Sequence, residues 1–345
     1  MSSDSYSLSE PATTGLLLIN LGTPDSPQVG DVRRYLAEFL SDPRIVEIPR
    51  LAWKAVLHGV ILRTRPKRSA RAYQAVWSDQ GSPLLYLSER LVATLANEIP
   101  VALGMRYGNP SIADALERLR ARNAQRILVL PLYPQYSATT TASTFDAIAR
   151  VLSTWRWIPE LRFINQYYQH PLYLEALANS VRAWQARHGV PDRLLMSFHG
   201  IPKDYAGAGD PYPLQCHATA HRLAGRLGLA DDAWALSFQS RMGPREWLKP
   251  YTSEMLKRWG EEGMRHVQVI CPGFPIDCLE TLEEIAVENR DVFLNAGGGR
   301  YEYIPALNDS AAQRTLIERL WRTHTQGWDL ADGQEAPRSG KETEQ

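Results

Sequence analysis

Eight short runs of apolar and β-branched residues are spread along the chain, and each run predicts a β-strand. They lie at residues 15–22, 101–108, 126–134, 161–168, 193–200, 233–240, 266–274 and 300–307. Strands that are apolar throughout, rather than alternating, are typical of parallel sheets covered on both faces. Long helical patterns separate them, such as the amphipathic segment 111–123, where Ser111 is placed to cap a helix. The pattern predicts an α/β fold with helices flanking parallel strands.

The second four strands echo the first four at their ends. The first strand of each half ends in NLGTP (20–24) or FHGIP (198–202), and the third ends in PLYPQYS (131–137) or PGFPIDC (272–278). The repeat predicts two similar doubly wound α/β domains, each with a parallel sheet flanked by helices. A cleft is expected between them at the carboxyl ends of the strands, where such sheets place ligands.

We expect the first domain at 13–163 and the second at 164–305. A helix over 306–328 should pack back on the first domain, and the polar stretch 330–345 should be a disordered tail. Residues 40–90 are too long for a simple crossover and contain the apolar stretch 51–67 with several basic residues. This region is either an extra helical hairpin on the core or a lid that meets a large apolar ligand or a membrane surface.

Composition narrows the class of protein. Lys plus Arg equals Asp plus Glu, at 38 each, so no global field favours nucleic acid. There is no apolar run of 18 residues and no signal-peptide pattern at the N-terminus. Three cysteines without a C-x-x-C pair argue against a disulfide framework and favour a reducing, cytoplasmic location.

Four acidic residues follow the seventh strand at helical spacing: Asp277, Glu280, Glu284 and Glu288. Like charges three and four apart repel by roughly 0.2–0.5 kcal/mol per pair. Helix capping accounts for the first two but not for Glu284 and Glu288. The stripe is therefore either a solvated helix face or a site that handles a hard divalent cation.

His199 ends the fifth strand, where a parallel sheet presents side chains to a ligand. It is either a histidine satisfied within the core or a base or metal ligand in the cleft. If the fifth and seventh strands are neighbours, His199 and Glu280 face one cavity, which favours the second interpretation.

Other patterns are weaker. His217 and His221 have the i, i+4 spacing of a zinc pair beside Cys216, but lack a general-base Glu between them and a third ligand. Gly22 follows a strand without the remaining glycines of a phosphate loop, and the segment 295–303 is glycine-rich before a strand rather than after one. Segment 137–146 offers hydroxyls and amides at a helix start that suit either an anion or simple capping.

Six separated motifs together resemble the ferrochelatases, the terminal enzymes of haem biosynthesis. They are NLGTPDSP, MRYGNP, LPLYPQYSATTTAS, SFHGIP followed by GDPYPLQC, SFQSRMGPREWL and CPGFPIDCLETLEEI, in the right order from about Gly15 to Leu307. The resemblance implies a two-domain chelatase fold and insertion of ferrous iron into protoporphyrin IX.

The resemblance also implies site residues. The catalytic pair falls on His199 and Glu280, both also candidate metal ligands, with Glu284 and Glu288 on a metal or proton path and Asp277 supporting the pair. Porphyrin contacts fall on Tyr73, Ser82, Arg106, Tyr107, Trp247 and Phe274.

No cysteine follows Cys278, so the resemblance implies no iron–sulfur cluster and no tightly bound cofactor. Cys278 stands where many relatives have histidine, which puts a third ligand there in doubt. Ferrous iron and protoporphyrin are the expected substrates, without nucleic acid and with transient peripheral contact to a membrane. The alternatives are a chelatase for another tetrapyrrole, such as coproporphyrin or a corrin precursor that takes cobalt, and a non-catalytic haem- or metal-binding protein.

Overall fold

The computed structural model describes residues 6–7, 11–243 and 245–328. All eight predicted strands are present: β1 Thr13–Thr23, β2 Val101–Gly108, β3 Ala124–Pro131, β4 Glu160–Phe163, β5 Arg193–His199, β6 Trp234–Gln239, β7 His266–Ile270 and β8 Arg300–Ile304. Six of them end earlier than expected, four of these by three residues or more. β7 and β8 end before Pro272 and Pro305, which cannot donate to a ladder.

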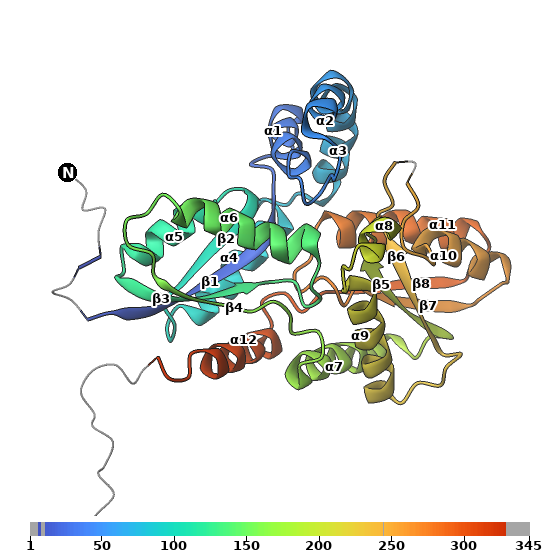
Figure 1. Ribbon diagram of the computed structural model, residues 1–345. Helices are drawn as coiled ribbons and strands as arrows, with labels where there is room; N and C mark the ends of the chain where they lie inside the picture. Colours follow the sequence, from blue (N-terminus) through green and yellow to red (C-terminus); the bar gives the residue numbers. More distant parts are fainter. Residues whose placement is uncertain (1–5, 8–10, 244, 329–345) are drawn as a thin grey trace, which may run out of the picture.

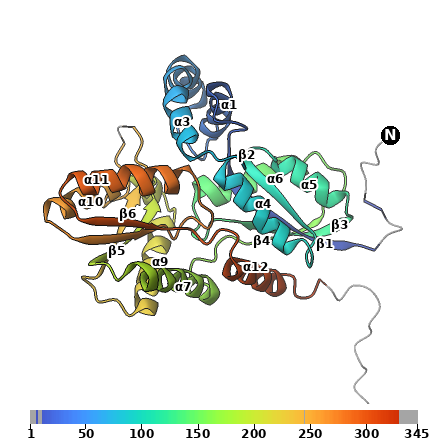
Figure 2. The ribbon, with the colours of Figure 1, turned by 180° about the vertical axis from the view of Figure 1, so that it is seen from behind.

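The strands form two four-stranded parallel sheets of identical topology. Their orders are β2-β1-β3-β4 and β6-β5-β7-β8, so the first strand of each half is central. The sheets form two lobes with helices on both sides, seen side by side in Figures 1 and 2. The two similar doubly wound α/β domains expected from the echoed strand ends are thereby confirmed.

The helices alternate with the strands as the pattern predicts. They are α1 Val29–Leu40, α2 Arg50–Val56, α3 Leu62–Val76, α4 Pro83–Leu95, α5 Ile112–Arg120, α6 Ser143–Leu152, α7 Pro171–His188, α8 Lys203–Gly207, α9 Tyr212–Leu227, α10 Thr252–Glu261, α11 Arg290–Asn295 and α12 Ala311–His324, with π-helices η1 Leu57–Ile61, η2 Ala138–Ala142 and η3 Glu280–Asn289. Ser111 caps α5, since its hydroxyl accepts the Asp114 N–H at 3.1 Å. Within the described residues, no helix is both long and apolar enough to cross a membrane.

Two glycines explain the echo of NLGTP and FHGIP. At Gly22, with φ of +110°, a Cβ would lie 1.7 Å from the carbonyl oxygen of Tyr107 on β2. At Gly200, a Cβ would lie 2.9 Å from the carbonyl oxygen of Gln239 on β6. Both positions lie where the end of a central strand closely approaches the backbone of its neighbour, and a side chain would clash there.

Helices α1, α2 and α3, with η1, form a unit that projects beyond the two lobes, above the region where they meet (Figure 1). It packs around its own apolar cluster, which includes Val32, Leu36, Leu57 and Tyr73. α12 follows the second sheet and packs against α4 of the first half and α7 of the second. The expected tail at 330–345 lies outside the described residues.

Candidate functional site

A cavity of about 450 Å³ lies where the carboxyl ends of both sheets meet the projecting helical unit. The end of β1 contributes Asn20–Thr23, the end of β5 contributes His199–Pro202, and the loop after β7 contributes residues 273–276. The helical unit supplies Trp53 and Tyr73 among others. Residues between 40 and 90 therefore wall a largely apolar cavity, and we call this segment the lid. Its role as a cover, one of the two alternatives that the sequence left open, stays a prediction.

His199 lines this cavity, and one hydrogen bond determines its neutral tautomer. Its Nδ1 lies 2.6 Å from the carbonyl oxygen of Gly200. A carbonyl only accepts, so Nδ1 carries the hydrogen and neutral His199 keeps a basic lone pair on Nε2. Its ring lies 6.4 Å, centroid to centroid, from that of Phe274.

Glu280 also lines the cavity, at the start of η3. β5 pairs directly with β7, the strand that leads to this helix, so the expected approach of His199 and Glu280 to one cavity is what the structure has. The helix itself differs from the expectation. The sequence predicts an α-helix through Glu288, but Glu280–Asn289 is a π-helix, a rare form often found at functional sites.

The remaining acids of η3 lead away from the cavity. Glu284 does not line it but accepts hydrogen bonds from both the N–H (2.7 Å) and the hydroxyl of Ser240. Burial raises the pKa of Glu284 above its ordinary value, partly offset by Ser240 and by His199. Glu288 is exposed at the next position along the helix.

Glu283 is a fourth carboxylate of this helix that the sequence analysis missed. Partial burial, together with the charges of Glu288 and Glu284, raises the pKa of Glu283 to about 7. The positive charge of Arg68, on the lid, lowers this pKa and so offsets part of the rise. The sequence analysis followed acidic residues at helical spacing and so missed Glu283, which directly precedes Glu284. Three carboxylates therefore share the outer part of η3.

Asp277 is buried behind the cavity, in a network of neutral donors. Its carboxylate accepts from Asn308 Nδ2 at 2.7 Å, Tyr303 Oη at 2.5 Å and Thr281 Oγ1 at 2.9 Å. Its N–H donates to Asn308 Oδ1 at 2.8 Å. These bonds tie the segment before η3 to the chain after β8, a place that suits the supporting role expected for it.

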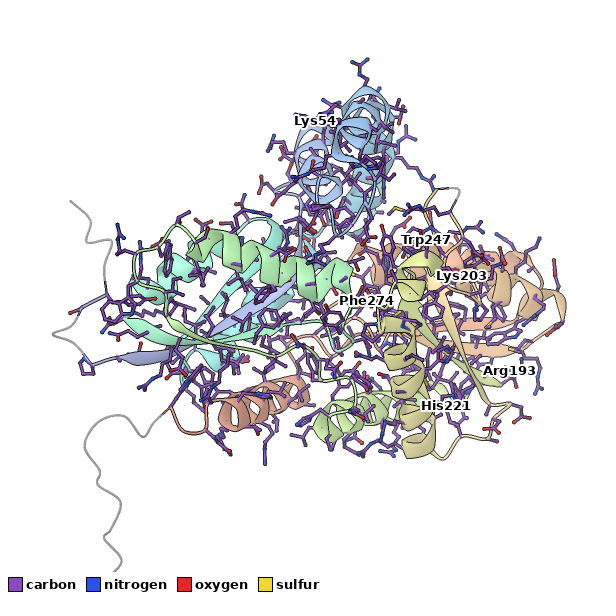
Figure 3. All side chains as sticks on the ribbon, in the orientation of Figure 1. Lys54, Arg193, Lys203, His221, Trp247 and Phe274 are labelled. Atoms are coloured by element: carbon purple, nitrogen blue, oxygen red, sulfur yellow. The ribbon has the colours of Figure 1, made fainter. Side chains whose placement is uncertain are left out.

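Four of the six residues expected to contact a porphyrin line the cavity: Tyr73, Ser82, Trp247 and Phe274. Figure 3 shows Phe274 between the two lobes and Trp247 near the base of the projecting unit. Arg106 and Tyr107 do not line it. The Arg106 guanidinium pairs with buried Asp42, and Tyr107 is fully buried with its hydroxyl 2.7 Å from the same carboxylate.

The sequence analysis also missed Arg65, which lines the cavity from α3. Burial lowers its pKa from the ordinary value, although the charge of Glu280 acts against this. Its Nη2 lies 2.8 Å from the sulfur of Met242, and no carboxylate pairs with it among the described residues. The run of basic residues in 63–71 was visible in the sequence, but nothing there marks which of them faces inward.

The weaker patterns do not form sites. His217 and His221 are exposed, and His221 packs edge-on against Trp234, at 5.0 Å between ring centroids. Figure 3 shows His221 well away from Phe274. No group of three or more potential ligands is arranged to hold a metal ion in the described part of the chain. Segment 137–146 begins with η2, which Ser137 caps.

Solved structures identify the class of this fold. SirB from Bacillus subtilis with Fe3+ aligns over 92% of this chain and 98% of its own, with a TM-score of 0.54 at 13% identity. The sirohydrochlorin chelatase SirB from Bacillus subtilis subspecies spizizenii, in complex with cobalt, aligns with a TM-score of 0.52 at 11% identity. The architecture is that of two-domain chelatases.

Sequence relatives give the family. The ferrochelatase family model matches residues 13–325. The ferrochelatase of Nitrosococcus oceani is 55% identical over 335 residues, covering 94% of this chain and 91% of its own. That of Thioalkalivibrio sulfidiphilus is 54% identical over 335 residues, covering 95% and 91%. The chain belongs to the ferrochelatase family, as the six motifs indicated.

Proposed function

We propose that the protein is a lyase that inserts ferrous iron into protoporphyrin IX, giving protohaem and releasing two protons. The observation that carries this is the placement of His199 and Glu280 on one apolar cavity beneath a lid. A porphyrin is a broad apolar disc that such a cavity suits, and metal entry requires removal of two pyrrole protons. The names of the relatives support the same reaction. The scheme needs no resident cofactor, because iron is a substrate.

In this scheme His199 accepts a pyrrole proton. Its Nδ1 is committed to Gly200, so the free lone pair is on Nε2. A base whose tautomer is fixed by a backbone carbonyl needs no reorganisation before proton transfer. Phe274 and Trp247 border the same space, where they supply apolar contact area for the macrocycle.

The carboxylates continue the route to solvent. Glu280 lines the cavity, Glu284 lies behind it at Ser240, and Glu288 is exposed. Because burial raises the pKa of Glu284, this carboxylate takes up a proton more readily than an ordinary one, which favours a proton exit along η3. Glu280 can also bind the incoming hydrated iron, since carboxylate oxygen suits a divalent cation.

The test is anaerobic incubation with ferrous iron and protoporphyrin, following the absorbance change from free base to metalloporphyrin. His199→Ala should bind porphyrin normally, as read by fluorescence quenching, yet lose metal insertion by about 100-fold or more. His221→Ala is the matched control and should retain full activity. Stoichiometric porphyrin binding without turnover in the unaltered protein would instead indicate a binding protein.

Protoporphyrin is proposed over other tetrapyrroles on the apolar character of the cavity. Coproporphyrin carries four carboxylates, and sirohydrochlorin-type substrates carry more. We expect kcat/KM to be highest for protoporphyrin when the three are compared under identical conditions. A higher value for coproporphyrin, or for cobalt insertion into a corrin precursor, would move the protein to the alternative function.

The lid also supports transient contact with an anionic membrane surface. From Ile48 to Ser78 the sequence carries seven basic residues and no Asp or Glu. Leu51, Val56 and Val60 are exposed on the same segment, Leu51 to 88%. Figure 3 places Lys54 on the outer part of the projecting unit. Exposed apolar side chains beside basic residues are the features of an interfacial helix.

Co-sedimentation with phosphatidylglycerol vesicles tests this contact. We expect Leu51→Ser and Lys54→Gln to weaken binding several-fold, and high salt to weaken it further. Leu214→Ser is the matched control, because Leu214 is 74% exposed on α9, outside the lid segment. Equal binding of all variants, or none by the unaltered protein, would contradict a membrane surface on the lid.

A further inference from the structure

We infer that Asp42 anchors one wall of the cavity and that Arg106 and Tyr107 act as positioning residues for that wall, not as contacts to the ligand. The inference rests on the proposed function only for the identity of that ligand. Asp42 lies between α1 and α2, at the base of the lid, and its side chain is 5% exposed.

Three donors from the first domain converge on one oxygen of Asp42. Oδ2 accepts from the Arg106 guanidinium, from Tyr107 Oη at 2.7 Å and from Ser143 Oγ at 2.6 Å. Oδ1 accepts the N–H of Arg44 at 2.8 Å. Charge-assisted hydrogen bonds of this kind are the stronger ones, and both carboxylate oxygens are occupied. Asp42 therefore ties the base of the lid to β2 and α6, beside a second tie in which Arg44 Nε donates to Asp146 of α6 at 2.8 Å.

Arg106 has its charge satisfied in this arrangement. Its Nε donates to the carbonyl of Ser143 at 3.0 Å and to its hydroxyl at 2.7 Å. Its guanidinium carbon lies 4.3 Å from the centre of the Tyr107 ring. Burial alone would raise the pKa of Asp42, but hydrogen bonds from Ser143, Arg44 and Tyr107 and the Arg106 charge hold that pKa below its ordinary value. A cation so paired offers little to a ligand carboxylate.

The segment that follows Asp42 forms part of the cavity wall. The Asp42 carbonyl accepts the N–H groups of Ile45 and Val46, at 3.0 and 3.1 Å, and both side chains line the cavity with Ile48. The segment's far side is tied to the second domain, because Tyr205 Oη donates to the carbonyl of Ile45 at 3.2 Å. This wall segment is thus tied to both domains. Asp42 fixes it to the first domain, and Tyr205 fixes it to the second.

The anchor can be tested without any ligand. In Asp42→Asn, the amide hydrogens of Ile45 and Val46 should exchange at least tenfold faster than in the unaltered protein, while those of β7 should not change. Arg106→Met and Tyr107→Phe should act in the same direction, with Tyr107→Phe the mildest because it removes one hydrogen bond. Unchanged exchange at residues 45–46 in correctly folded Asp42→Asn would overturn the anchor, even if the protein proves to be no chelatase.

Steady-state kinetics then distinguish a positioning role of these residues from direct contact with the porphyrin. We expect Asp42→Asn and Arg106→Met each to raise the porphyrin KM about tenfold with little change in kcat, and the double variant to be no worse than the poorer single variant. Arg90→Met, which removes an exposed ion pair with Asp309, is the control. A contact role predicts instead that Asp42→Asn has normal KM and that Arg106→Met alone loses the preference for the porphyrin diacid over its dimethyl ester. That pair of results would overturn the inference.

If Asp42→Asn does not fold, Tyr107→Phe carries the same test. It keeps the ion pair and removes only the hydroxyl that donates to Oδ2. A several-fold rise in porphyrin KM with unchanged kcat supports the anchor, and an unchanged KM with unchanged exchange at residues 45–46 contradicts it.

Discussion

At the scale of single residues, the acidic helix holds a group whose titration lies close to neutral pH. Glu283 has its pKa raised to about 7 by partial burial and by the charges of Glu288 and Glu284. An acid with a higher pKa in the folded state than in the unfolded chain binds a proton in the window between the two values. The contribution of Glu283 to stability is therefore highest below that window and falls as pH rises from about 4.5 to about 7.

Glu283→Gln should remove this dependence. The variant should have a higher Tm than the unaltered protein at pH 8, where Glu283 is ionised, and nearly the same Tm at pH 5. Thermal unfolding at the two pH values checks it. Glu89→Gln, an exposed position of α4, should change Tm equally little at both. A Tm difference for Glu283→Gln that does not grow from pH 5 to pH 8 would show that Glu283 carries no penalty when ionised.

Single-residue roles were predictable where a residue type is rare at its place. His199 stands out because it ends an apolar strand, and Glu280 because it opens an acidic stripe. Glu283 and Arg65 could not be found this way. Each is one of several like residues in its segment, and only packing against the other elements decides which of them is buried. The resemblance pointed to Arg106, yet its partner Asp42 is 64 positions away along the chain.

At the scale of elements, the strands could be predicted from the sequence, but the π-helical form of η3 could not. Spacings of three and four fit an α-helix and remain compatible with a π-helix, so the stripe could not separate them. In the structure, side chains donate hydrogen bonds to three carbonyl groups of η3. Gln239 Nε2 donates to the carbonyl of Glu280 at 2.9 Å, Asn289 Nδ2 to that of Glu284 at 2.8 Å, and Tyr301 Oη to that of Ile285 at 2.7 Å. Two of these donors lie outside the helix, beyond the reach of a local pattern.

The contact between Ser240 and η3 leads to a second prediction. Ser240 has φ of +66° and directs both its N–H and its hydroxyl to Glu284. Ser240→Gly keeps the N–H and tolerates the positive φ, so it removes the hydroxyl alone. Loss of one hydrogen bond to the ionised form should raise the pKa of Glu284 further. The rising limb of activity against pH should then move up by about 0.5–1 pH unit, because one such bond is worth about 1 kcal/mol.

The pH–rate profile of Ser240→Gly against the unaltered protein is the measurement. A lower rate at every pH without displacement of the limb would mean that Ser240 shapes the loop and does not tune Glu284. An identical profile would remove Glu284 from the proton path, and the route through η3 would then have to begin and end at other groups.

At the scale of the whole molecule, the two halves share a topology but divide the chemistry. Aligning NLGTP with FHGIP places Leu21 opposite His199, and aligning the aromatic–Pro pairs places Thr139 opposite Glu280. All four line the cavity. The sequence predicted the duplication because strand ends and glycines are local features. The cavity itself depends on how the lobes and the lid meet, which local patterns do not encode. The duplicated fold supplies two walls, and only the second carries ionisable groups at these positions.

The helix α12 helps to hold these walls together. It belongs to the end of the chain yet contacts α4 and α7, from different halves, and Leu316 is 2% exposed within an apolar cluster that includes residues of both sheets. Leu316→Ala should therefore lower the free energy of unfolding by about 2–5 kcal/mol, the usual cost of such a cavity in a core. Chemical denaturation followed by tryptophan fluorescence measures it, with exposed Thr315→Ala on the same helix as the control. Since the cluster is continuous across both halves, a single transition should move as a whole. Two separate transitions, with only one displaced, would show that α12 stabilises one lobe and does not couple them.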